Sequence, residues 1–69
     1  MVEVFKTNVL RKREAKMLIQ KLAEHFPNHK VNFDLDDCDK ILRVEGKNIL
    51  QDKIIEIMNL QGYQCEVLE

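Results

Sequence analysis

Apolar residues in this chain recur with two different spacings, and the order in which these spacings alternate constrains the fold most strongly. A spacing of two, typical of a strand with one buried face, predicts four strands. These are residues 2–5, 31–35, 40–45 and 64–67. Spacings of three and four predict two helices. One runs from Arg11 to Phe26, and the other carries Leu50, Ile54, Ile57 and Met58. Pro27 is expected to end the first helix and Gly62 the second.

The order strand, helix, strand, strand, helix, strand is that of the split β-α-β, or ferredoxin-like, fold. With 69 residues for six elements, we expect a single domain over residues 1–69. The predicted class is α+β, a sandwich in which a four-stranded antiparallel sheet of order 4-1-3-2 carries both helices on one face. The inward-facing strand residues are expected to be Val4, Phe33, Leu42 and Val67.

Composition argues against several function classes. The 11 basic and 12 acidic residues leave a net charge of -1, so no global field attracts nucleic acid. One Tyr, three Phe and no Trp provide few surfaces on which bases could stack. No glycine-rich phosphate loop is present, and a serine-based catalytic set is impossible because the chain has no serine. We therefore expect neither nucleic-acid binding nor enzymatic activity.

Two cysteines, Cys38 and Cys65, lie far apart and match no disulfide framework of a small secreted protein. No signal-peptide pattern and no apolar run long enough to span a bilayer are seen. A cytoplasmic protein with reduced thiols and no membrane partner is therefore expected.

The apolar positions of both predicted helices share their spacing with a known family. They are Ala15, Leu18, Ile19 and Leu22 in the first helix, and Ile54, Ile57 and Met58 before Gly62-Tyr63 in the second. Over nearly its whole length the chain thus resembles the heavy-metal-associated domains of copper chaperones, mercury-binding proteins and metal-pumping ATPases. Thr7 stands where this family commonly has a Thr before its first metal-binding cysteine. The resemblance implies the ferredoxin-like fold and a former metal loop after the first strand.

The departures from the family fall within that loop. Asn8 stands at the first cysteine position, Arg11 at the second, and Phe5-Lys6 replaces the usual Gly-Met. Soft ions such as Cu(I) select thiolates, whereas Asn8 offers a neutral amide and Arg11 a permanent positive charge. We therefore expect Thr7, Asn8 and Arg11 to be degenerate positions of the metal loop, and no cofactor.

Charged residues of both signs are expected at one end of the sheet, where the loop after the first strand meets the turn between the middle strands. The candidate docking surface comprises Lys6, Arg11, Lys12, Arg13, Asp36, Asp37 and Asp39. These side chains either neutralise one another in solvent or dock a partner of complementary charge. Positive charges in the first turn of a helix oppose its dipole, which favours the docking interpretation.

The favoured hypothesis is a non-enzymatic protein-interaction module without the metal-binding cysteine pair. Its partner would be an unidentified protein or a second copy of the chain. The alternative is a metal-binding or metal-chaperone function at a displaced, weak site for Cu or Zn. That site would use Cys38 with Asp36 and Asp39, and Cys65 could contribute.

Overall fold

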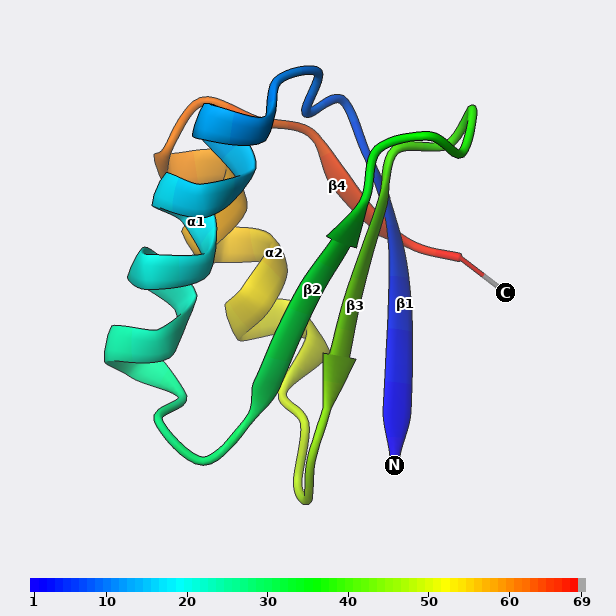
Figure 1. The fold of residues 1–69 in the computed structure, drawn as a ribbon. Helices are drawn as coiled ribbons and strands as arrows, with labels where there is room; N and C mark the ends of the chain where they lie inside the picture. The colour runs from blue at the N-terminus through cyan, green and yellow to red at the C-terminus, as the bar shows by residue number, and fades with distance from the viewer. Residues whose placement is uncertain (69) are drawn as a thin grey trace.

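A computed structural model describes residues 1–68 of the chain. Six elements follow one another in the predicted order (Figure 1). They are β1 (Val2–Thr7), α1 (Lys12–His25), β2 (Lys30–Asp34), β3 (Ile41–Glu45), α2 (Gln51–Leu60) and β4 (Cys65–Val67). The α+β, ferredoxin-like class is confirmed.

The four strands form one antiparallel sheet in the order β2-β3-β1-β4, which is the predicted order 4-1-3-2 read from the opposite edge. β1 lies in the centre, where it pairs with β3 on one side and with the short β4 on the other. Both helices cover one face of the sheet and leave the other face open (Figure 1). Strands β2 and β4 are therefore the two edges.

The ends of α1 have local causes. At its start the side chain of Glu14 accepts a hydrogen bond from the backbone N–H of Arg11 (3.1 Å). This is half of a capping box, because an arginine side chain has no acceptor to complete it. At its end the N–H of Phe26 still donates to the carbonyl of Leu22 (2.8 Å), and Pro27 follows. Neither helix within residues 1–68 is long and apolar enough to cross a membrane.

A Schellman motif ends α2. The N–H of Gly62 donates to the carbonyl of Asn59 (3.0 Å), and the N–H of Tyr63 donates to the carbonyl of Met58 (3.0 Å). Gly62 has a φ of +93°, so its predicted role as a left-handed stop is confirmed. At the other end of α2 the prediction was wrong, because Leu50 precedes the helix and is 59% exposed.

The core fills the space between the sheet and the helices. Its fully buried side chains are Phe5, Val9, Leu18, Leu22, Leu42, Val44, Ile54 and Met58. Phe5 of β1 lies opposite Leu42 of β3 and Val67 of β4, so one aromatic ring connects three strands. The helices bury the apolar stripes that their spacing predicted.

The expectation that Val4 faces inward was wrong. Phe5 has no exposed surface, whereas Val4 lies opposite Arg43 and is only half-buried. Because successive strand side chains point to opposite faces, Glu3 also faces the helices, and its carboxylate accepts a hydrogen bond from Gln51 of α2 (2.7 Å). The ring of Phe5 fills the core, so Val4, its neighbour in the strand, necessarily lies on the opposite, open face.

His29 lies in the connection between α1 and β2, and its ring lies beside Gly46, which directly follows β3. Its centroid lies 5.3 Å from that of Phe26. A Cβ on Gly46 would come within 2.8 Å of the His29 ring, and Gly46 has a φ of +156°. Glycine is therefore the residue that allows this ring to pack against the start of the β3–α2 connection.

Candidate functional site

Three connections meet at the other end of the sheet, and together we call them the loop–hairpin end. They are residues 8–11 after β1, residues 35–40 between β2 and β3, and residues 61–64 after α2 (Figure 1). These segments are far apart in the sequence. Side-chain hydrogen bonds of Thr7, Asn8 and Tyr63 join these connections to one another or to the adjoining ends of β1 and α1.

Thr7 ties the end of β1 to the hairpin between β2 and β3. It is buried, with 7% of its surface exposed. Its N–H donates to the carbonyl of Asp39 (3.1 Å), and its hydroxyl donates to the carbonyl of Lys40. The same hydroxyl oxygen accepts from the N–H of Val9 (3.3 Å). The residue that the resemblance marks as part of a metal loop thus has a structural role here.

Asn8 and Arg11, at the two expected cysteine positions, lie in different surroundings. The side-chain oxygen of Asn8 accepts a hydrogen bond from the backbone N–H of Gln64 (2.8 Å), which joins the loop to the segment before β4. Arg11 is exposed at the start of α1. The amide oxygen of Asn8 is already used, and Arg11 brings a cation, so these two positions offer no soft ligand.

A third tie joins Glu14 of α1 to Tyr63. The Tyr63 hydroxyl donates to the second carboxylate oxygen of Glu14 (3.0 Å). This hydrogen bond is the main cause that lowers the pKa of Glu14 below its ordinary value of 4.5 and raises the pKa of Tyr63 above 10.0. Glu14 was not among the predicted site residues, although a glutamate three residues after a helix N-cap is a known capping signal.

The Glu14–Tyr63 bond predicts losses of stability at both ends of the pH scale. Because the carboxyl pKa is lowered by folding, its contribution is complete above pH 4.5 and is lost as pH falls through the lowered value. Because the phenol pKa is raised, its contribution is complete below pH 10.0 and is lost as pH rises through the raised value. The free energies of unfolding of Tyr63→Phe and of the native chain, measured by urea titration, should therefore differ most at neutral pH. A difference that stays constant from acid to alkali would contradict this coupling.

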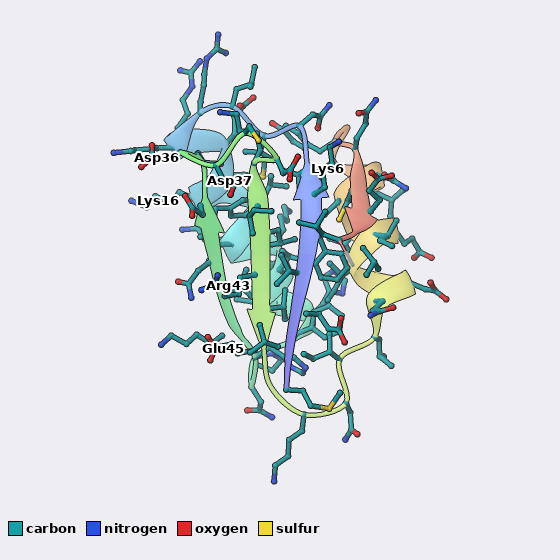
Figure 2. The ribbon with its side chains drawn as sticks, turned by 90° about the vertical axis from the view of Figure 1, so that its right-hand side faces the viewer. Lys6, Lys16, Asp36, Asp37, Arg43 and Glu45 are labelled. Atoms are coloured by element: carbon teal, nitrogen blue, oxygen red, sulfur yellow. The ribbon has the colours of Figure 1, made fainter. Side chains whose placement is uncertain are left out.

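The charged residues at this end are mostly exposed. Lys6 and Asp39 approach to 3.9 Å, an ion pair whose side chains are 50% and 35% exposed. Arg11, Lys12 and Arg13 are exposed along the start of α1, and so are Asp36 and Asp37 in the hairpin. In Figure 2 Lys6 lies on the open face of β1, and both labelled hairpin aspartates lie at the same end of the sheet. The end therefore presents a basic region beside an acidic one.

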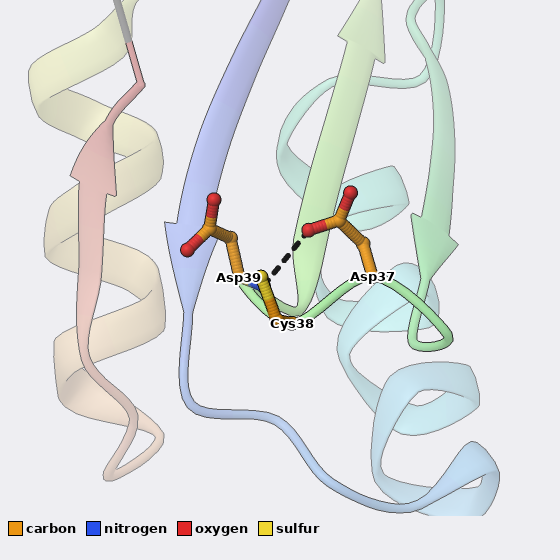
Figure 3. A group of neighbouring side chains, drawn as sticks. All are labelled: Asp37, Cys38 and Asp39. Atoms are coloured by element: carbon orange, nitrogen blue, oxygen red, sulfur yellow. Dashed lines mark hydrogen bonds between the residues drawn. The ribbon is translucent and has the colours of Figure 1, made fainter.

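The hairpin holds one group with metal-ligand chemistry within the described residues. The ligand atoms of Asp37, Cys38 and Asp39 all lie within 4.8 Å of one another (Figure 3). A turn accounts for their closeness, because Asp37 accepts a hydrogen bond from the backbone N–H of Asp39 (2.8 Å). Asp36 is outside this group, and its N–H instead donates to the side chain of Asp34 (3.3 Å).

Cys65 does not join that group. It is half-buried in β4, opposite Thr7 of β1. Burial, assisted by the charge of Glu66, raises the pKa of Cys65 to about 12. At neutral pH this side chain is a thiol, and the thiolate is the form that binds metal ions.

No protein-family model matches this chain, and no match was found among curated proteins or solved structures. The similarity to heavy-metal-associated domains therefore stays a prediction from the sequence. A function for the chain has to be argued from the residues of the loop–hairpin end.

Proposed function

We propose that this chain is a non-enzymatic protein-interaction module that docks a partner through the loop–hairpin end. The observation that carries the proposal is the state of the loop after β1, where Asn8 is bonded to Gln64 and Arg11 is an exposed cation. A loop of this kind offers no ligands for a soft metal ion. It keeps a fixed shape, because Thr7 and Asn8 bond it to its neighbours.

Charge supports docking at this end. Arg11, Lys12 and Arg13 stand at the N-terminal end of α1, where the helix dipole disfavours positive charge, so helix stability does not explain them. Their exposure leaves them able to meet an acidic surface on a partner. Complementary charge of this kind mainly increases the rate and the specificity of association.

The test is to compare binding partners retained by immobilised variants of the chain. Arg11→Glu should lose a partner that the native chain retains. Cys38→Ser, and the native chain in the presence of a chelator, should keep it. The Arg11 change does not threaten the fold, because a negative charge near the start of α1 is favourable to the helix dipole.

Lys47→Glu provides the matched control, since Lys47 is an exposed residue in the β3–α2 connection, away from the loop–hairpin end. A partner lost equally by Arg11→Glu and Lys47→Glu would point to general electrostatic attraction. A partner lost on chelation or with Cys38→Ser would contradict the proposal.

The second candidate function is metal binding at the hairpin, which the grouping of Asp37, Cys38 and Asp39 favours. Such a site would combine one thiolate with carboxylates, a mixed set that suits Zn better than Cu(I). Lys6, which pairs with the Asp39 carboxylate, and the backbone N–H of Asp39, which donates to the Asp37 carboxylate, compete with a metal ion for these oxygens. Saturable amide shifts in the hairpin on titration with Zn(II), absent in Cys38→Ser, would establish this function.

A further inference from the structure

The edge strand β2 has a free side. Within residues 1–68 it pairs with β3 alone, from Lys30 opposite Glu45 to Asp34 opposite Ile41. The backbone groups on its outer side therefore have no neighbouring strand. An edge of this kind is a template for a further strand, and its side chains decide which strand fits.

The five residues of β2 are complementary to their own reversed order, Lys-Val-Asn-Phe-Asp. When two copies pair antiparallel about Asn32, Lys30 of each lies opposite Asp34 of the other. In the same register Val31 of each lies opposite Phe33 of the other. We propose that this chain forms a symmetric dimer in which the two β2 strands pair in this register.

The faces of the strand agree with this register. Lys30, Asn32 and Asp34 are exposed, whereas Val31 and Phe33 are half-buried beneath the helices. Directly opposite residues of an antiparallel pair share one face. The charged pairs thus stay on the open face and the apolar pairs extend the core side. A slip of one residue would bring charged positions onto the apolar face.

The other edge does not fit its own copy. β4 has three residues, Cys65–Val67, and its antiparallel self-pair would place Glu66 opposite Glu66 of the second copy. Like charges directly opposite one another are destabilising. The charge pattern therefore selects β2, and the pairing of identical edges closes the assembly as a dimer.

A groove beside β2 adds apolar surface to this edge. It has a volume of about 420 Å³ and lies between α1 and β2. Its apolar lining includes Ile19, Phe33 and Leu35, and Lys16 and Asp36 line it near the hairpin, where Figure 2 shows both at the β2 edge. A second copy along β2 would shield this lining from water, which favours association.

The dimer goes beyond the proposed function and depends on the pairing of β2, although Lys12 and Asp36, which line the groove, also belong to the candidate docking surface. Because the two β2 strands run antiparallel, the loop–hairpin ends of the two copies would lie at opposite ends of a continuous eight-stranded sheet. Arg11 and Asp37 do not line the groove that the second copy would cover, so this part of each end would remain accessible. The dimer would thus carry two separate docking surfaces for a partner.

Sedimentation of charge variants across micromolar to millimolar concentration tests the dimer. The native chain should dimerise in this range. Lys30→Asp makes both charged positions of β2 acidic, and Asp34→Lys makes both basic, so each variant alone should dimerise about tenfold or more weakly. An equimolar mixture of the two should regain dimers at native strength, because each Asp then meets a Lys. Lys47→Asp, a matched charge change outside the edge, should leave the dimer unchanged.

A variant could also dimerise weakly because its fold is less stable. Dimers that return in the equimolar mixture show that the loss came from the charges facing one another across the two β2 strands. This matters for Lys30→Asp, which places an acid opposite Glu45 within the chain. A native chain that stays monomeric at millimolar concentration would overturn the proposal. The proposal would also be overturned if Lys30→Asp and Asp34→Lys each dimerised as strongly as the native chain, or if their mixture formed no more dimer than either variant alone. None of these outcomes bears on the loss of a partner with Arg11→Glu, so the two proposals fail independently.

Discussion

Phe5→Ala is expected to lower the free energy of unfolding by about 3–5 kcal/mol, the range for removing a large buried aromatic side chain. Phe5 has no exposed surface and connects β3, β1 and β4 through Leu42 and Val67. A domain of this length has only about 3–10 kcal/mol in total. The variant should therefore be partly or fully unfolded at room temperature, which urea titration followed by circular dichroism would measure.

Val4→Ala is the matched control for this prediction. Val4 is next to Phe5 but half-buried on the open face, opposite Arg43. Its truncation should cost about 1 kcal/mol or less, as for other partly exposed strand positions. If Val4→Ala proved as damaging as Phe5→Ala, Val4 could not lie on the open face of β1.

Thr7→Val should lower the free energy of unfolding by about 2 kcal/mol, although valine has nearly the same shape as threonine. The change leaves the carbonyl of Lys40 and the N–H of Val9 without the hydroxyl that bonds both. Unpaired polar groups in a buried position are costly. Urea unfolding measures the loss, and amide hydrogen exchange should show the Val9 N–H exchanging faster than in the native chain.

Thr7→Ser distinguishes the contribution of the hydroxyl from that of the methyl group, because it removes only the methyl group. Serine keeps both hydrogen bonds and should preserve slow exchange at Val9. Faster exchange in Thr7→Ser than in Thr7→Val would assign the role of Thr7 to packing. Equal and slow exchange in both variants would show that the hydroxyl does not hold the loop.

Much of the architecture could be predicted because it follows from local rules. The helical spacing of Ala15, Leu18 and Leu22 predicted the buried stripe of α1, and Gly62 predicted the end of α2. The split β-α-β order then predicted the strand order of the sheet, which the structure confirms. Each of these features depends on residues that are neighbours in the sequence or on a strongly restricted topology.

The details of the candidate site depend on contacts between distant segments. Glu14 and Tyr63 are 49 positions apart, and Asn8 and Gln64 are 56 apart. No spacing rule connects such residues, so their hydrogen bonds could not be predicted. The same holds for Cys65, whose pKa depends on burial in the folded sheet.

The sequence by itself determined the order of elements and the chemistry of the loop after β1, because each depends on residue types at fixed separations. Only the tertiary structure decided that Phe5 and not Val4 enters the core. It also decided that Thr7 and Asn8 anchor the loop–hairpin end, and that the hairpin groups Asp37 with Cys38 and Asp39. The physical reason is that burial and long-range hydrogen bonding arise only once the strands are aligned and both helices cover one face of the sheet.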